Sequence, residues 1–250
     1  MNIANGHYDC KMELHYWGEA PELKGITLLV SVVGVGNAGQ LAAEALLSCF
    51  SFVKVAFCKH EAVVPCAGNQ RGELILNLEI FLWHEKKIAV LLQRAPFISG
   101  KRKLFYEDLA TFTQEREIEH VVLLGSLPAF RRNDAFLGAT VVAFPDLSRG
   151  LIPHGLFREM DIEDFVEEDE DTRGHPSGPV REALLSFTER GMPTDCLSIF
   201  ASEGNNQIDG LELARAVTLV LKLDARFLQV PKDWELIFGG ESDSSRSLYI

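Results

Sequence analysis

Continuous apolar runs recur along this chain and are bounded by turn-forming or charged residues. Five of them are rich in β-branched and other apolar side chains: 26–33, 53–58, 120–124, 140–144 and 196–201. Runs of this length and composition predict strands. The run at 26–33 has too few polar positions for a strand with one face in solvent, so we expect it to be buried on both faces of a sheet.

Helical periodicity separates these predicted strands. Four segments place apolar side chains three to four positions apart: 40–50, 105–117, 179–190 and 209–223. Pro179 stands near the start of the third segment and Gly191 follows its end, an asymmetry typical of a helix. Asp209 is the expected N-cap of the last helix, because its carboxylate can accept a hydrogen bond from an amide of the first turn.

Residues 73–82 instead alternate in polarity. Leu74, Leu76, Leu78 and Ile80 occupy one face and Asn77 and Glu79 the other, which predicts a half-exposed strand. Residues 87–92 are its expected hairpin partner across 84–86. Strands that alternate with helices, together with this antiparallel pair, predict an α/β fold with three α/β/α layers and a mixed sheet.

Two polar segments stand apart from this pattern. Nine acidic residues gather within thirteen positions: Glu159, Asp161, Glu163, Asp164, Glu167, Glu168, Asp169, Glu170 and Asp171. Such a block repels itself, so we expect residues 159–178 to form a mobile loop. Residues 239–247 have the composition of a flexible linker. The sequence therefore predicts one α/β domain over 1–238 and a C-terminal tail over 239–250.

Charge and composition narrow the possible partners. The chain has 24 Lys or Arg residues against 36 Asp or Glu, a formal net charge of −12. Nucleic-acid binding relies on a basic face, so we expect no nucleic-acid partner and a partner with basic pockets instead. The most apolar stretch near the N-terminus, 26–35, is too short to span a membrane. Five cysteines without a C-x-x-C pair favour a reducing compartment.

The turn after the first predicted strand contains a literal G-x-G-x-x-G, with Gly34, Gly36 and Gly39 at its fixed positions. This pattern between a strand and a helix is the context of a dinucleotide site. However, Cys58, Lys59 and His60 follow the second strand, where that site needs an acidic residue. The turn is thus open to two interpretations, a nucleotide site or a tight connection that needs a positive φ and close helix packing.

Other catalytic or metal-binding patterns are weaker still. The chain has no G-x-S-x-G, and its seven histidines lack the H-x-x-x-H spacing of a helical metal site. Gly125 and Ser126 follow a predicted strand and are expected to form a turn. His120 opens an apolar strand and is expected to be a satisfied core or edge residue instead of a metal ligand. We therefore predict no catalytic, cofactor-binding or metal-binding residue.

The predicted tail ends in three residues that favour docking. Leu248, Tyr249 and Ile250 follow a polar linker, and exposed apolar groups at a free end gain stability only when they are buried. A terminal carboxylate would add a fixed charge for a Lys or Arg to recognise. These residues leave three alternatives open. The tail docks on another protein, packs onto its own domain, or has no role.

Several short motifs, in order, resemble those of the proteasome assembly chaperone 2 family. They are 23–29 (L-K-G-I-T-L-L), 35–42 (V-G-N-A-G-Q-L-A), Val64-Pro65, Leu92-Gln93-Arg94, Arg132-Asn133-Asp134, Ser202-Glu203-Gly204-Asn205-Asn206, and Pro231 and Trp234 with 236–239. No single motif is specific to the family, but the occurrence of all of them in the same order as in the family is specific. The resemblance covers nearly the whole chain.

The resemblance implies a fold similar to that of nucleoside phosphorylases, without their catalysis or cofactors. It implies a cytoplasmic and nuclear chaperone that pairs with proteasome assembly chaperone 1. The heterodimer would bind proteasome α-subunits, promote α-ring assembly and prevent aberrant α-ring dimers. Fungal and archaeal relatives dock through a C-terminal hydrophobic–Tyr–any tripeptide between α-subunits, and Leu248, Tyr249 and Ile250 match it position by position.

Two other functions remain as hypotheses at this point. The glycine turn at 34–39 allows a nucleotide- or nucleoside-binding enzyme. A homodimeric scaffold unrelated to the proteasome is the third possibility. The helix predicted at 209–223 is apolar over a wide arc, as expected either for a core helix or for one at a dimer interface.

Overall fold

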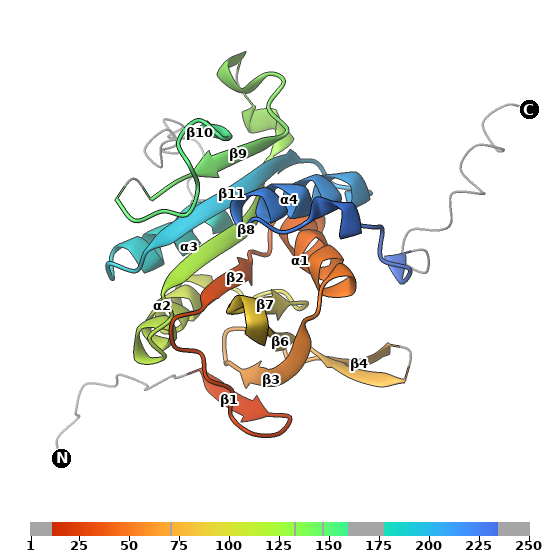
Figure 1. Ribbon diagram of the computed structural model, residues 1–250, viewed down its shortest axis with the longest axis vertical. Coiled ribbons are helices and arrows are strands. Elements are labelled where there is room, and N and C mark those ends of the chain that lie inside the picture. The colour runs from red at the N-terminus through yellow and green to blue at the C-terminus, as the bar shows by residue number, and fades with distance from the viewer. Residues whose placement is uncertain (1–11, 71, 133, 147, 160–177, 235–250) are drawn as a thin grey trace, which may run out of the picture.

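The computed structural model describes residues 12–70, 72–132, 134–146, 148–159 and 178–234, which fold around one large sheet (Figure 1). In spatial order its nine strands are β1 (Glu13–Tyr16), β3 (Val53–Lys59), β6 (Leu78–Trp83), β7 (Ile88–Gln93), β2 (Thr27–Ser31), β8 (His120–Pro128), β11 (Thr194–Ala201), β9 (Val141–Phe144) and β10 (Arg158–Glu159). A separate two-stranded ribbon consists of β4 (Ala67–Gln70) and β5 (Glu73–Leu76).

The sheet is parallel at its centre and mixed toward its edges. Strands β7, β2, β8 and β11 are parallel neighbours. On one side β6, β3 and β1 continue the sheet by antiparallel pairing, and on the other side β9 is antiparallel to β11. The predicted mixed sheet is therefore confirmed, including the β6–β7 hairpin, which turns through the 3₁₀ segment His84–Lys86.

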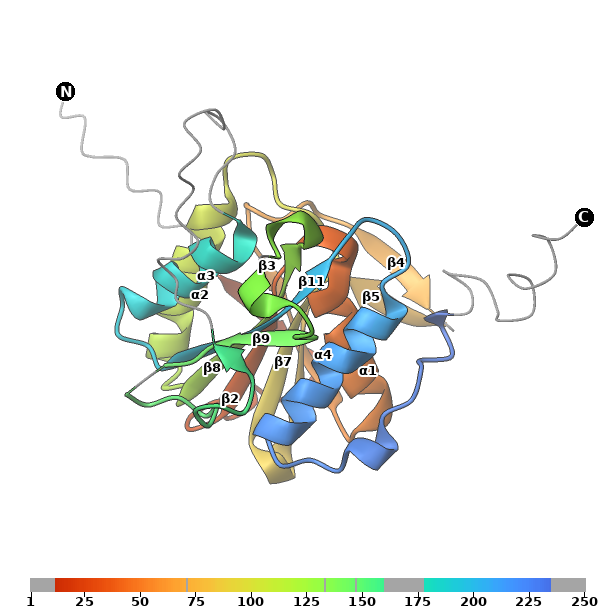
Figure 2. The ribbon, with the colours of Figure 1, turned by 90° about the horizontal axis from the view of Figure 1, so that it is seen from above.

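Helices cover both faces of the sheet, as the sequence predicts (Figure 2). Helices α1 (Ala38–Cys49) and α4 (Gln207–Val220) pack side by side on one face. Helices α2 (Arg102–Glu115) and α3 (Pro179–Thr188) pack together on the other. Each pair covers its own apolar core, with Leu46 and Val217 in one and Phe105 and Phe187 in the other. The three-layer α/β/α architecture is confirmed.

The central strands carry both cores. Every residue of β11 is buried, as is every residue of β8 except Pro128. The predicted turn at Gly125 and Ser126 is wrong, because both residues continue β8. A Cβ at Gly125 would lie only 2.4 Å from Val180 Cγ2, so this glycine lets α3 approach the strand closely.

The segment predicted as one half-exposed strand at 73–82 is two strands in two different sheets. Asn77 separates them, and its side chain donates a hydrogen bond to the Val64 carbonyl (3.1 Å) while its own carbonyl accepts one from the Arg94 amide (2.9 Å). Alternation continues across this break, so polarity alone does not reveal it. Glu79, which we predict to face solvent, is instead fully buried within β6.

Helix α4 begins earlier than predicted. Asn206 is its N-cap position, and the Asn205 side chain accepts a hydrogen bond from the Gln207 amide (3.1 Å). Asp209 lies inside the first turn, so its predicted role as N-cap is wrong. The short strands β1, β4 and β10 are too brief for periodicity to indicate. Residues 160–177 and 235–250 lie outside the described residues, so the predicted acidic loop and tail stay predictions.

Candidate functional site

The tripeptide that the sequence singles out, Leu248, Tyr249 and Ile250, lies outside the described residues. What the structure does describe is how the chain reaches this segment. After α4 the chain passes the end of α1, where the Gln229 amide donates to Cys49 Sγ (3.3 Å). It then reaches Trp234, the last described residue, where the chain is attached to the core of the domain.

Trp234 is the anchor of this attachment. Only 1% of its surface is exposed, and it belongs to the core beneath α1 and α4. Its indole Nε1 donates a hydrogen bond to Glu44 Oε2 of α1 (3.2 Å), and its amide donates to the Pro231 carbonyl (3.0 Å). A buried tryptophan whose N–H is satisfied holds its segment in one position.

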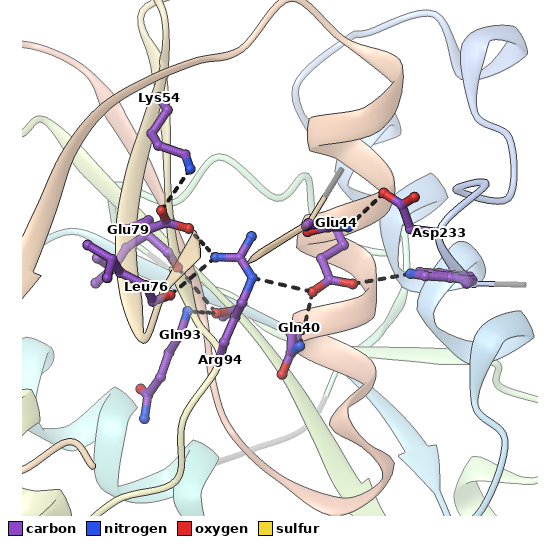
Figure 3. A network of polar contacts seen from close by, with 12 residues as sticks. Gln40, Glu44, Lys54, Leu76, Glu79, Gln93, Arg94 and Asp233 are labelled. Atoms are coloured by element: carbon purple, nitrogen blue, oxygen red, sulfur yellow. Dashed lines mark hydrogen bonds and ion pairs between the residues drawn. The ribbon is translucent and has the colours of Figure 1, made fainter. Parts of the chain in front are cut away.

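Glu44 continues this contact into a buried ionic network, shown in Figure 3. Its carboxylate accepts from Gln40 Nε2 (3.0 Å) and lies 3.9 Å from Arg94 Nε. Arg94 in turn pairs through Nη1 with Glu79, whose other carboxylate oxygen is 2.9 Å from Lys54 Nζ. We call these five residues, Lys54, Glu79, Arg94, Glu44 and Trp234, the anchor network.

The anchor network joins Trp234 to four other parts of the fold. Lys54 lies on β3, Glu79 on β6 and Glu44 on α1, while Arg94 follows β7. The Glu79 side chain is 0% exposed and that of Arg94 16% exposed, so the carboxylate is removed from bulk water and the guanidinium is largely removed from it. Removal of one partner of such a buried pair costs about 3–5 kcal/mol, because the other charge is left uncompensated.

The β4–β5 ribbon also contacts the end of the described chain. Gln70 Nε2 of β4 donates a hydrogen bond to Asp233 Oδ2 (2.6 Å), next to Trp234. Lys54 donates to the Leu74 carbonyl of β5 (2.7 Å) as well as pairing with Glu79. The ribbon therefore contacts Asp233 and the anchor network includes Trp234, which are the last two described residues.

The glycine turn at 34–39 is filled by the protein itself. Gly36 has a φ of 63°, and a Cβ there would lie 2.2 Å from Asn206 Nδ2. A Cβ at Gly34 would lie 2.8 Å from Ser126 Oγ, and one at Gly39 would lie 2.1 Å from the Leu124 carbonyl oxygen. Each glycine thus permits a close contact within the fold, which agrees with the interpretation as a tight connection with close helix packing.

The order of strands in the sheet also differs from that of a dinucleotide-binding unit. In a dinucleotide-binding unit the strands before and after the first helix lie side by side. Here β7 and β6 separate β2 from β3, and β3 is antiparallel to β6. The Asn206 side chain occupies the space against Gly36, which the second glycine of a dinucleotide fingerprint leaves for the pyrophosphate. This geometry favours a structural role for the turn.

Motifs far apart in the sequence meet at the carboxyl rim, the edge where β2, β8 and β11 end. Asn206 Nδ2 donates to the carbonyls of Ser202 (2.9 Å) and Gly204 (3.0 Å) beside Gly36. Ser126 Oγ donates to the Val35 carbonyl (2.7 Å), and Arg132 lies 4.9 Å from the Phe200 ring. The family-like motifs at 35–42 and 202–206, and Arg132 from a third, are therefore parts of one packed rim.

Two buried histidines have carboxylate partners. His120 Nε2 is 2.9 Å from Asp195 Oδ2, which confirms His120 as a satisfied core residue. His60 Nδ1 accepts from the Ala62 amide (3.0 Å), so its Nε2 carries the proton donated to Asp108 (3.0 Å). Within the described ranges, no three His, Cys, Asp or Glu residues are placed to hold a metal ion together.

The buried thiols are poor nucleophiles in this environment. Burial raises the pKa of Cys196 to about 12, despite a hydrogen bond with Ser198 that acts in the opposite direction. Burial likewise raises the pKa of Cys58 far above its ordinary value. Both thiols therefore stay protonated at neutral pH, as expected for residues that serve in the core.

Sequence reasoning missed most of the anchor network. Trp234 and Arg94 belong to motifs that the sequence does identify, but Glu44 has the usual appearance of an exposed helical residue and Glu79 that of a solvent-facing strand residue. Glu44 and Trp234 are 190 positions apart, so no local pattern can link them. Glu79 itself is the signal in the sequence that could have indicated a buried ion pair, because it is the charged residue of an otherwise apolar strand.

Fold and site together define an α/β/α protein with a mixed nine-stranded sheet, a glycine turn used for packing, and a buried Trp234 that is hydrogen-bonded to a network of ion pairs. No helix in the described part of the chain is long and apolar enough to cross a membrane. The chain belongs to the PAC2 family, whose sequence model matches residues 28–223.

Curated relatives agree with this assignment. A Danio rerio protein named proteasome assembly chaperone 2 is 30% identical over 243 residues, which cover 88% of this chain and 94% of that protein. The Homo sapiens protein of the same name is 27% identical over 248 residues, with the same coverage of both chains. The resemblance to the proteasome assembly chaperone family is thereby confirmed.

Solved structures show the same fold. Pyrococcus furiosus PbaA, an archaeal homolog of proteasome-assembly chaperone, superposes with a TM-score of 0.66 at 13% identity and covers 91% of this chain and 93% of its own. Pyrococcus furiosus PbaB, an archaeal proteasome activator, gives a TM-score of 0.55 at 17% identity and covers 87% and 93%. At these identities the likeness establishes the architecture. The expected likeness to nucleoside phosphorylases stays a prediction.

Proposed function

We propose that this chain is a subunit of a proteasome assembly chaperone and acts as a heterodimer with proteasome assembly chaperone 1. The heterodimer binds proteasome α-subunits, promotes assembly of the α-ring and core particle, and prevents aberrant α-ring dimers. The observation that carries this proposal is the 30% identity to a proteasome assembly chaperone 2 across 88% of the chain. The net charge of −12 suits partners with basic pockets, and we propose no nucleic-acid or membrane partner.

The proposed function involves no catalysis and no cofactor. Packing of all three fingerprint glycines against protein atoms supports this, because a nucleotide would need the space beside Gly36 that Asn206 fills. Separation of β2 from β3 in the sheet supports it further. We place the protein in the cytoplasm and nucleus, where proteasomes are assembled and where the free cysteines among the described residues stay reduced.

Within this function, Leu248, Tyr249 and Ile250 are the proposed contact with the α-ring. Leu248 packs in an apolar pocket between neighbouring α-subunits, and Tyr249 wedges between them and forms a hydrogen bond. Three residues alone bind weakly, so the domain must raise their effective concentration near the pocket. The anchor network supports this role, because it fixes the chain at Trp234, from which the tripeptide is carried.

An affinity purification tests the proposal. The chain is tagged at its N-terminus and expressed in its native cell, either in full or ending at Ser247, with Ser247→Ala as the matched control. We expect the full and control chains to recover both the partner chaperone and α-subunits. The shortened chain should keep the partner chaperone and lose α-subunits. Recovery of α-subunits by the shortened chain would exclude the tripeptide, and recovery of none by any form would exclude the function.

The rival enzyme hypothesis has its own test. Purified chain is heated in the presence of NAD, NADP, nucleosides or nucleotides, each at millimolar concentration. A ligand that binds only the folded state raises the unfolding temperature. We expect no shift with any of them, and a shift that Gly36→Ala abolishes would restore the nucleotide-binding interpretation.

A further inference from the structure

A groove of about 520 Å³ follows the outer flank of α4, where the helix faces β9 and the short edge strand β10. In Figure 1, β9 and β10 form the end of the sheet opposite β1. Three leucines line the groove with much of their surface in solvent: Leu137 (66% exposed), Leu156 (42%) and Leu219 (58%). The groove is therefore an apolar surface that the described fold leaves uncovered.

Helix α4 continues this surface along one of its faces. Residues 208, 212, 215 and 219 are spaced three or four positions apart and form one stripe of the helix. Ile208, at the start of the stripe, is 75% exposed, whereas Leu213 and Val217 on the opposite face are buried in the core. The stripe thus has an exposed isoleucine at its start, the Glu212–Arg215 ion pair in its middle and the exposed Leu219 at its end, where it enters the groove. Exposed apolar side chains rimmed by charged ones are typical of a surface that binds another protein.

Charged groups around the groove indicate what kind of protein fits. Arg215 is exposed on α4, and Arg158 is exposed on β10, where its Nε donates to the Ala135 carbonyl (3.0 Å). Glu212 is the carboxylate among the lining residues, 3.6 Å from Arg215 Nη1. The lining thus carries two cations and one anion, although the chain as a whole has a net charge of −12.

A second copy of this chain is a poor occupant of the groove. In a two-fold symmetric dimer the same surface faces itself, and a lining with two arginines and one carboxylate supplies too few anions to pair the arginines of both copies. The remaining surfaces of both copies would also repel each other, since each chain is strongly acidic. A different chain with apolar side chains flanked by carboxylates satisfies both the leucines and the arginines.

We propose that this groove is the docking surface for the other subunit of the chaperone heterodimer. That subunit inserts apolar side chains between Leu137, Leu156 and Leu219 and presents carboxylates to Arg158 and Arg215. The inference rests on the heterodimer proposed above and adds the surface through which it forms. It places the partner on the outer flank of α4, away from the packed side of the helix that faces α1.

Binding of purified full-length chain to purified proteasome assembly chaperone 1 tests the surface. Leu219→Glu and Arg215→Glu should each weaken the complex about tenfold or more, because each places a carboxylate against apolar or acidic groups of the partner. Phe227→Glu is the matched control, since Phe227 is 58% exposed like Leu219 but lies outside the groove. It should leave the affinity within about twofold of the unaltered chain. Arg215→Glu keeps the test valid should Leu219→Glu disturb folding.

The possible outcomes separate this inference from the function on which it rests. If the unaltered chain binds the partner and both groove variants bind equally well, the surface is wrong and the heterodimer stands. If the unaltered chain does not bind the partner, heterodimer and surface both fail. If light scattering shows a homodimer that Leu219→Glu dissociates, the groove binds a second copy and the inference is overturned.

Discussion

Two buried carboxylates, Glu79 on β6 and Asp195 on β11, have side chains that are 0% exposed but different kinds of partner. Asp195 accepts hydrogen bonds from the amides of Asp146 (2.7 Å) and Leu151 (2.6 Å) and from His120. Glu79 instead pairs with the side-chain cations of Arg94 and Lys54.

The difference determines how far each carboxylate acts. Backbone amides of the loop after β9 and the His120 side chain of the neighbouring strand β8 satisfy Asp195, so it fixes the loop at Asp146, Leu151 and Ile152 against the sheet. Glu79 is instead connected to distant parts of the fold. Arg94 pairs with both Glu79 and Glu44, and Glu44 accepts a hydrogen bond from Trp234. Asp195 is thus a local anchor and Glu79 a long-range anchor, although both are carboxylates. Substitutions at the two positions should have different effects.

Asp195→Ala is expected to have the largest effect on folding. It leaves several buried N–H groups without an acceptor, each costing about 1–3 kcal/mol, so the free energy of unfolding should fall by about 5 kcal/mol. Urea denaturation at pH 7 measures the loss. Asp195→Asn is the control, because it retains one oxygen acceptor and should lose less. A loss below about 1 kcal/mol for the alanine variant would show that the loop does not depend on this carboxylate.

Glu79→Leu should lower the free energy of unfolding by about 3–5 kcal/mol, because it leaves Arg94 buried without its main partner. Adding Arg94→Met should restore at least about 1 kcal/mol, since an apolar pair of similar size needs no charge compensation. The same urea titration measures both variants. Strictly additive losses would contradict the description of Glu79 and Arg94 as a coupled buried pair.

Trp234→Phe tests whether the long-range anchor reaches the C-terminal segment. It removes the hydrogen bond to Glu44 and keeps an aromatic ring in the core, so it should cost only about 1 kcal/mol. Hydrogen exchange at residues 229–234 should accelerate in this variant and in Glu79→Leu. In Asp195→Asn these amides should exchange as in the unaltered chain. Equal effects of all three would remove the distinction between the two anchors.

The smallest expected effect is a pH dependence of the loop at Asp195. Burial raises the pKa of Asp146, but hydrogen bonds from Ser148 and from the amide of Arg149 outweigh it and hold this pKa below its ordinary value of 3.8. A carboxyl with a lowered folded-state pKa stabilises the fold above pH 3.8 and loses that contribution as the pH falls further. Urea titrations between pH 5 and pH 3 should therefore show a smaller pH dependence for Asp146→Asn. An unchanged dependence would rule out this contribution.

The layered fold was largely predictable from the sequence. Buried runs and helical periodicity are direct consequences of which face meets the core, so the central strands and all four helices follow from them. Asn77 was missed as a break because alternation continues across it. The cap of α4 was misassigned because Asn205, Asn206 and Asp209 are all chemically suited to that role.

The candidate site was predictable only in part. Gly36 and Asn206 each belong to an identifiable motif, but only the fold brings them together at the carboxyl rim. Burial of Glu79 depends on cations supplied by two other strand regions, which no window of sequence contains. The tripeptide at 248–250 shows the opposite case, since its chemistry is visible in the sequence, whereas it lies outside the described residues and its docking stays a proposal.

The most direct test of the account is to deplete this chain from its native cell and separate proteasome assembly intermediates by native electrophoresis. The proposed function predicts fewer complete α-rings, accumulation of α-ring dimers, and recovery when the full chain is restored but not when a chain ending at Ser247 is supplied. Normal levels of α-rings and core particles in depleted cells would contradict the account.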